Sequence, residues 1–174
     1  MRGLPSCGKT TAAKRIVEQG GEAFEFDEYF YTQVGSDPRR YDWSRSKLPE
    51  ARTWNIQRVR DALDRGVSPV VFDDDNRTGY TTHACVTHAL ARGYEIDFRE
   101  PDSPWWPTIR ALLDDAKANA SELQRWAEKL AVLSRGTHQV PVESFLRRMK
   151  RWRPELTVED ILAAHRAGEK HVRT

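Results

Sequence analysis

Three stretches in the first hundred residues read as helices, and a glycine closes each one. In the second, Ile56, Val59, Ala62 and Leu63 recur at the three- and four-residue steps of one helix face. Glycine is a frequent C-terminal stop. The pattern therefore predicts helices over residues 10–18 (TTAAKRIVE), 49–65 and 81–92.

Short apolar runs lie between these helices and predict strands. They are 23–26 (AFEF), 68–76 (SPVVFDDDN) and 94–99 (YEIDFR). Residues 31–49 are rich in Gly, Pro, Asp and Arg and predict mostly loop. Strands that alternate with helices indicate an α/β fold with a mainly parallel sheet. Ligands bind such folds at the carboxyl ends of the strands, where Asp27 and residues 73–76 stand.

Beyond Pro107 the apolar positions follow helical spacing without a strand between them. They are Ile109, Leu112, Leu113, Ala116, Ala120, Leu123, Ala127 and Leu130. This spacing predicts one long amphipathic helix or a helical hairpin, either packed against the body or acting as a mobile lid over the substrate. Residues 156–166 predict a last helix with Thr157 as its N-cap, and we expect the tail after Gly168 to be frayed.

Composition narrows the class of protein. The 174 residues are 39% hydrophobic and 31% charged, with a net charge of +2, as in an ordinary globular domain. There is no apolar run of membrane-spanning length and no signal-peptide core. Two cysteines are too few for a disulfide framework. We therefore expect one domain, residues 1–174, in a reducing cytoplasm.

The first residues carry a phosphate-binding pattern. Gly3, Gly8, Lys9 and Thr10 match G-x-x-x-x-G-K-[ST], in which backbone N–H groups at a helix start cradle phosphates. Lys9 would reach the β- and γ-phosphates of ATP, and the Thr10 hydroxyl would bind Mg²⁺. The residues expected to contact the nucleotide are Gly3, Pro5, Ser6, Cys7, Gly8, Lys9, Thr10 and Thr11. The alternative is a glycine turn that caps a structural helix.

Cys7 sits inside this pattern and has two interpretations. At a helix N-terminus its thiol could ionise readily and respond to oxidants. The simpler interpretation, which we favour, is a small residue that fills a loop position.

Acidic residues follow two of the predicted strands. Asp27 suits a base that accepts a proton from an attacking hydroxyl, or alternatively a helix N-cap beside a structural Glu28. Asp73, Asp74 and Asp75 suit a Mg²⁺ site, with Thr10 and Asp74 as the expected ligands, or alternatively solvated loop acids. Since three successive side chains cannot all point the same way, at most two would serve the metal.

The stretch 135–153 is basic, with six Arg or Lys residues and one acidic residue, Glu143. It could clamp ATP phosphates, bind a polyanionic substrate, or be a solvated helix face. Trp152 lies among the cations, and Trp105 and Trp106 precede the helical stretch. Arginines interleaved with aromatics are typical of single-strand nucleic-acid binding.

In this order, the segments resemble a known family. RGLPSCGKTT, FDEYF, SPVVFDDDN, RGYEIDFREPDSPWW and RGTHQVPVESFLRRM together resemble the small P-loop kinases that include phage polynucleotide 5′-hydroxyl kinase, the zeta toxins and related kinases of bacteria and animals. The resemblance covers most of residues 2–150. It implies an adenylate-kinase-like P-loop NTPase fold with a parallel sheet flanked by helices, a lid or insertion at about 107–135, and basic C-terminal helices at about 141–168.

The resemblance also implies roles for single residues. Asp27 falls on the general base, Lys9 and Thr10 on the phosphate and Mg²⁺ contacts, and Arg135 on a lid arginine that stabilises the transferring phosphoryl group. Asp74 and Asn76 fall on the motif beside the acceptor. We expect Arg147, Arg148 and Arg151 to complete the substrate side.

Three departures from the family pattern stand out. Phe30 replaces an arginine that contacts the acceptor phosphate, residues 108–130 look like an insertion, and Ala131 replaces a second lid arginine, for which Arg110 or Arg125 could substitute.

These features predict an ATP- and Mg²⁺-dependent kinase of a hydroxyl on a nucleic acid or nucleotide. Two alternatives stay open: a zeta-toxin-like kinase of a small molecule such as a nucleotide sugar, and a nucleotide-binding module whose catalysis has decayed. The phosphate loop also lacks the strand that usually precedes it, since only Met1 and Arg2 come before Gly3. We therefore expect the natural reading frame to start upstream, with Met1 an internal methionine.

Overall fold

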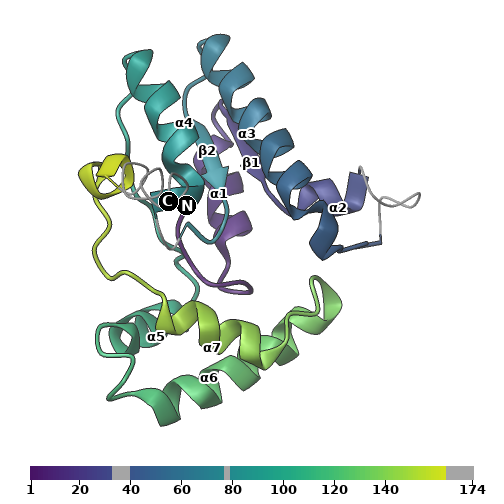
Figure 1. Ribbon diagram of the computed structural model, residues 1–174, viewed down its shortest axis with the longest axis vertical. Coiled ribbons are helices and arrows are strands. Elements are labelled where there is room, and N and C mark those ends of the chain that lie inside the picture. The colour runs from purple at the N-terminus through teal and green to yellow at the C-terminus, as the bar shows by residue number, and fades with distance from the viewer. Residues whose placement is uncertain (33–39, 77–78, 164–174) are drawn as a thin grey trace, which may run out of the picture.

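A two-stranded parallel sheet forms the centre of the body. The computed structural model describes residues 1–32, 40–76 and 79–163 (Figure 1). Strand β1 (Glu22–Glu25) pairs with β2 (Val70–Asp73), with Glu22 opposite Val70 and Glu25 opposite Asp73. This register places the carboxylates that follow both apolar runs at one edge of the sheet.

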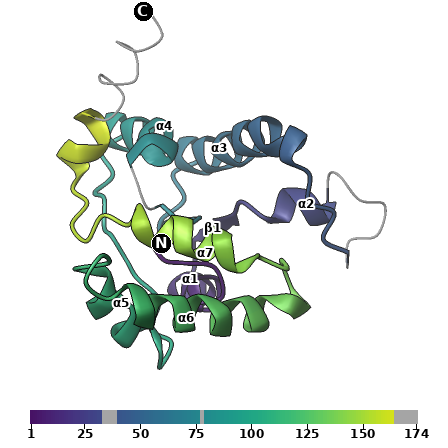
Figure 2. The same cartoon turned by 60° about the horizontal axis from the view of Figure 1, so that its bottom comes forward.

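Helices cover both faces of the sheet. The three predicted helices are confirmed with shifts of one or two residues: α1 (Lys9–Val17), α3 (Leu48–Asp64) and α4 (Gly79–Ala91). Figure 2 shows α3 and α4 on one side of the sheet and α1 on the other. Of the stretch 31–49 that the sequence predicts as mostly loop, α2 (Glu28–Thr32) covers the start and η1 (Arg45–Lys47) lies near the end, while residues 33–39 lie outside the described residues. The buried side chains of α3 and α4 meet Phe24 of β1 in one apolar cluster.

The expected strand at 94–99 does not form. Residues 94–100 are assigned no regular structure, and the described residues contain only the two strands β1 and β2. A strand needs a neighbour for its backbone N–H and C=O groups. Here a groove of about 800 Å³ separates most of this segment from β2. The alternating apolar side chains of this segment are partly buried, but the strand pairing that the pattern predicts is wrong.

Met1 and Arg2 line part of this groove. The α-ammonium of Met1 donates to the carbonyl of Phe72 (2.9 Å), and the N–H of Arg2 donates to the carbonyl of Arg99 (2.7 Å). Burial lowers the pKa of the Met1 ammonium to about 6. The groove beyond it is lined mainly by apolar side chains, among them Val70, Val71, Phe72, Tyr94, Ile96 and Phe98.

Residues 106–152 form a helical unit with its own core. It comprises α5 (Trp106–Leu113), α6 (Ala120–Leu133), the turn η2 (Ser134–Gly136) and α7 (Val142–Lys150). Of the two predicted forms, the hairpin is the one observed. The chain turns between α5 and α6, where the Asn119 amide donates to the Leu112 carbonyl (3.1 Å) and the Asp115 carboxylate accepts the N–H of Ala118 (2.9 Å).

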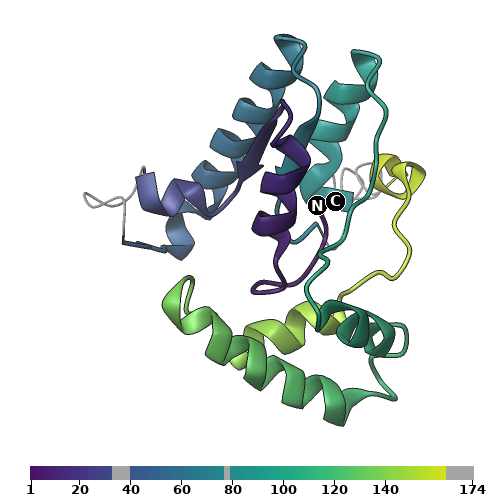
Figure 3. The ribbon, with the colours of Figure 1, turned by 180° about the vertical axis from the view of Figure 1, so that it is seen from behind.

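The core of the helical unit includes part of the phosphate loop. Leu4 and Cys7 are fully buried among residues of α5, α6 and α7. Trp106 and Trp152 pack edge to face in the same cluster, with ring centroids 5.4 Å apart. In Figure 3 this unit lies directly below the loop that leads into α1. The unit thus contacts the phosphate loop, and the two sequence interpretations, a packed element and a mobile lid, both stay predictions.

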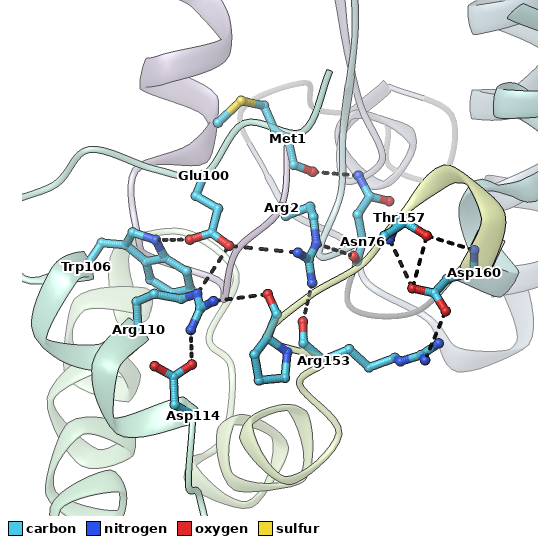
Figure 4. A network of polar contacts seen from close by, with 11 residues as sticks. Met1, Arg2, Asn76, Glu100, Trp106, Arg110, Asp114, Arg153, Thr157 and Asp160 are labelled. Atoms are coloured by element: carbon cyan, nitrogen blue, oxygen red, sulfur yellow. Dashed lines mark hydrogen bonds and ion pairs between the residues drawn. The ribbon is translucent and has the colours of Figure 1, made fainter. Parts of the chain in front are cut away.

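A polar network ties the helical unit to the body around Arg2 (Figure 4). Arg2 is only 4% exposed; its guanidinium donates to the carbonyls of Asn76 (3.2 Å) and Arg153 (2.6 Å) and lies 4.7 Å from the Trp152 ring centroid. Arg110 contacts Glu100 (3.4 Å) and donates to the Pro154 carbonyl (3.0 Å). The start of the chain, the 100–106 segment and the end of the unit therefore meet at one point.

The last described helix covers residues 158–163. Thr157 is its N-cap, as predicted: its hydroxyl accepts the Asp160 N–H (3.1 Å), and the Asp160 carboxylate accepts the Thr157 N–H (3.0 Å). Leu156 and Ile161 pack on Val86. The remainder of the predicted helix 156–166 and the tail after Gly168 lie outside the described residues. None of the helices searched is long and apolar enough to cross a bilayer.

The groove beside β2 yields a first prediction. An added segment of about five Val, Ile and Leu residues before Met1 should raise the melting temperature by several degrees, because it buries apolar surface and replaces a buried ammonium with a peptide N–H. ATP affinity should rise with it. Differential scanning fluorimetry and ATP titration measure the two effects.

A Gly/Ser segment of the same length is the matched control for this extension. Equal melting temperatures for the apolar and the Gly/Ser extensions would show that the groove does not accept a strand.

Candidate functional site

The loop before α1 has the geometry of an anion cradle. Ser6 and Gly8 adopt positive φ angles of 59° and 86°, and no side chain caps the start of α1 at Lys9. The N–H groups of the first helical turn are therefore free to bind a phosphate. Gly3 is also required, since a Cβ there would lie 2.7 Å from Cγ of Pro101.

Lys9 stands in the middle of this cradle. Its ammonium donates to the carbonyl of Leu4 (3.1 Å), which holds the side chain across the loop. Burial alone would lower the pKa of Lys9, but Asp75 and Asp73 together with weaker neighbours outweigh burial and raise it. Lys9 therefore provides a fixed positive charge beside the position where a phosphate would bind.

Thr10 and Asp73 form the best pair for a cation. The Thr10 hydroxyl donates to Oδ2 of Asp73 (3.0 Å). Asp73 is only 2% exposed, and its Oδ1 has no hydrogen-bond partner among the described residues. A buried carboxylate oxygen without a partner is costly, and a hard cation such as Mg²⁺ would satisfy it. The oxygen ligands present here fit Mg²⁺.

Asp27 lies at the end of β1, on the same edge of the sheet. Tyr41 donates its hydroxyl to Oδ1 of Asp27 (2.7 Å), and Nδ1 of His138 lies 3.5 Å from Oδ2. Its neighbour Glu28 pairs with Arg58 (2.5 Å), which matches the structural role expected for it. Asp27 thus combines partial burial with two oriented neighbours.

Comparisons with known proteins place the first part of the chain in a family. A family model described as "AAA domain" matches residues 1–106, which is more than half of the chain. The chain belongs to this AAA-domain family.

A curated human relative also matches the first part of the chain. NEDD4-binding protein 2 is 32% identical to it over 108 residues, which is 61% of this chain and 6% of the relative. The chain therefore spans only a small part of that protein. No solved structure matches at a significant level. Membership in the AAA-domain family establishes a P-loop NTPase fold of the kinase-like group and supports nucleotide binding.

The structure separates the three aspartates at the end of β2, of which Asp73 is the last residue of the strand. Thr10 and Asp74 are the Mg²⁺ ligands expected from the sequence, but the aspartate that accepts the Thr10 hydroxyl is Asp73. Oδ1 of Asp74 accepts the N–H of Asp75 (2.6 Å), and burial followed by the charge of Asp75 raises the pKa of Asp74 to about 6. Asp75 pairs with Arg148 (2.6 Å). The expectation that the three side chains diverge is thus confirmed.

Other residues named from the sequence lie away from this centre. The buried Asn76 amide donates to the carbonyls of Met1 (2.6 Å) and Phe72 (3.2 Å), so it holds the start of the chain. Phe30 is fully buried in a core cluster. Arg110 belongs to the network around Arg2 and is not available as a lid arginine (Figure 4).

The basic residues divide into two groups. Arg148 reaches Asp75, and burial opposed by Asp75 leaves its pKa raised. Arg135, Arg147 and Arg151 are exposed. Trp106 and Trp152 are buried, at 3% and 6% exposure, which corrects their expected role in stacking on nucleobases. At these two positions, therefore, no exposed indole ring lies among the basic side chains.

The remaining loop positions have simple roles. Pro5 is buried and Thr11 is exposed. Cys7 is fully buried, and burial raises the pKa of its thiol to about 12. A thiol in that state is a poor nucleophile, so the packing interpretation of Cys7 is confirmed.

Three neighbours of Asp27 were not identified from the sequence: Glu25, Tyr41 and His138. Glu25, Asp27 and His138 offer ligand atoms that all lie within 4.8 Å of one another. Burial, then Asp73 and Asp27, raises the pKa of Glu25 to about 7. Only Glu25 had a sequence signal, because it lies two residues before Asp27 and alternate residues of a strand share a face. Tyr41 and His138 reach the site by folding of distant loops.

The raised pKa of Glu25 gives a pH prediction. Because the pKa of Glu25 rises from its ordinary value of 4.5 to about 7 in the folded chain, the contribution of Glu25 to stability is present below pH 4.5 and is lost as pH rises to 7. Glu25→Gln should therefore gain stability relative to the parent between pH 5 and pH 8, on the order of 2 kcal/mol. Urea unfolding in EDTA measures this difference.

Glu22→Gln is the matched control, since Glu22 lies at the other end of β1 in an exposed pair with Arg65. A pH-independent difference between Glu25→Gln and the parent would contradict the assignment.

Proposed function

We propose that the protein is an ATP- and Mg²⁺-dependent kinase that transfers the γ-phosphoryl group to a hydroxyl on a nucleic acid or nucleotide. The observation that carries the proposal is the gathering of the phosphate loop, the Thr10–Asp73 pair and Asp27 at the same edge of the sheet. Phosphoryl transfer needs an anion cradle, a cation site and a base in one place.

In the proposed reaction each group has one task. Asp27 accepts the proton of the acceptor hydroxyl while the hydroxyl oxygen bonds to the γ-phosphorus of ATP. The bond between the γ-phosphorus and the oxygen that bridges it to the β-phosphate breaks, and ADP leaves. Lys9 and the N–H groups at the start of α1 hold the phosphates. Thr10 and Asp73 would hold Mg²⁺, which neutralises charge on the phosphates when bound. We assign to Arg135 the stabilisation of the negative charge that develops on the transferred phosphoryl group.

The cationic side chains at the end of the helical unit favour an anionic acceptor. Arg148 pairs with Asp75, while Arg147 in α7 and Arg151, the residue that follows α7, are both exposed. Next to Asp27, the Tyr41 ring lies 4.8 Å from the His138 ring and 5.2 Å from the Tyr31 ring. Partly exposed flat rings beside cations suit the bases and phosphates of a nucleotide.

The burial of Trp106 and Trp152 favours a second candidate. Without these indoles on the surface, the basic stretch offers less to a long single strand, and a small phosphorylated molecule such as a nucleotide sugar becomes the competing acceptor. The third alternative is a nucleotide-binding module without transfer. Labelled ATP with Mg²⁺ and a panel of 5′-hydroxyl oligonucleotides, hydroxymethylated DNA and nucleotide sugars separates the three.

Two substitutions test the catalytic assignment. Asp27→Asn should lower kcat by about 10² to 10⁴-fold, because it removes the base, while the Kd for ATP stays within twofold. Lys9→Ala should lower turnover by about 10²-fold or more and weaken ATP binding. Rapid-quench kinetics and ATP titration measure both. Transfer by Asp27→Asn at the parental rate would show that the base is another group.

Loss of two exposed cations tests the acceptor class. Arg147→Ala with Arg151→Ala should weaken oligonucleotide binding and lower the salt slope by about 1.4, the amount for two contacts to a single strand. The double variant Lys117→Ala with Lys129→Ala, on the α5–α6 side, removes the same charge and should leave the slope unchanged. Unaltered oligonucleotide affinity in the Arg147/Arg151 variant would favour the small-molecule acceptor.

A further inference from the structure

The loop between η2 and α7 has one defined shape. Ser134 is fully buried; its hydroxyl accepts the N–H of Val140 (2.9 Å) and donates to the carbonyl of Ala131 (2.9 Å). The Ser134 carbonyl accepts the N–H of Gln139 (2.8 Å), which adopts a positive φ of 49°. A non-glycine residue in that conformation is strained, so the surrounding bonds must hold it there. They fix the backbone next to His138.

His138 projects from this loop toward the end of β1. Its side chain is 20% exposed, and Nδ1 lies 3.5 Å from Oδ2 of Asp27. The ring also contacts Tyr41 and lies 6.3 Å from the Tyr31 ring. The ionisable groups that face it are therefore Asp27, Glu25, Tyr31 and Tyr41. The imidazole therefore lies between a carboxylate on one side and an aromatic ring on the other.

Tyr41 occupies the other oxygen of Asp27. Burial, and then the charge of Asp27, raises the pKa of Tyr41, so the phenol remains a neutral donor to Oδ1. Tyr41 in turn packs on the buried Phe30, with ring centroids 5.7 Å apart. One carboxylate oxygen is thus fixed by the body of the protein, and the second faces a residue of the helical unit.

We propose that His138 is a positioning residue for Asp27. Its N–H orients Oδ2 toward the acceptor hydroxyl, and this contact exists only while the loop 134–141 holds the shape described above. The inference rests on the proposed function for the role of Asp27, while the contact itself stands on geometry. Because the loop joins η2 to α7, seating of the helical unit and readiness of the base become one event. Neither Tyr41 nor the sheet alone provides this link.

Kinetics of three variants test the proposal. His138→Ala should lower kcat by about tenfold, with the KM for ATP changed less than twofold, because the phosphate cradle is untouched. His138→Gln and His138→Asn keep an N–H donor, and the better placed of the two should recover most of the loss and leave the shape of the pH–rate profile above pH 7 as in the parent. Parental kcat in His138→Ala, or a loss that neither amide recovers, would overturn the proposal.

A measurement without turnover separates this inference from the proposed function. In Asp27→Asn the imidazole ¹⁵N signals of His138 should shift at fixed pH, while those of His88, which pairs with Asp64 (2.8 Å), should not. A shift without kinase activity in the parent would keep the contact and refute the kinase. Kinase activity with no shift at His138 would refute the positioning role and keep the kinase.

Discussion

Excess negative charge at the carboxyl ends of β1 and β2 is the constraint on which the site depends. Glu25, Asp27 and Asp73–Asp75 meet there because parallel pairing brings both strand ends to one edge. Like charges at short range destabilise the folded chain unless cations or protons offset them. Lys9 and Arg148 offset part of this charge, and burial followed by the charge of acidic neighbours raises the pKa values of Glu25 and Asp74. Such an edge favours a ligand that arrives with a divalent cation.

The phosphate loop serves two structures at once. Its backbone forms the anion cradle, while Leu4 and Cys7 belong to the core of the helical unit. Arg2 then fastens the same stretch to Asn76 and Arg153. The shape of the cradle consequently depends on packing against the helical unit as well as on its own glycines. The loop is preorganised for binding, and the side chains at these positions lose conformational freedom in return.

The sequence predicted what is local and missed what depends on pairing or distance. Helices α1, α3 and α4 followed from apolar spacing and glycine stops. The strand at 94–99 failed because a strand also needs a partner, which no local pattern reports. Which aspartate faces Thr10 depends on strand register, because a shift of one residue moves every side chain of a strand to the other face of the sheet. His138 lies more than a hundred residues from Asp27, and only the fold brings them together.

The packing of Leu4 and Cys7 into the helical unit has a thermodynamic consequence. A ligand that orders the cradle stabilises the cluster that encloses these two residues, and unfolding of α5–α7 releases the cradle. Nucleotide binding and the integrity of the helical unit therefore share one free-energy term. Substitutions in the buried face of α6, far from any phosphate, can thus change nucleotide affinity by a population effect alone.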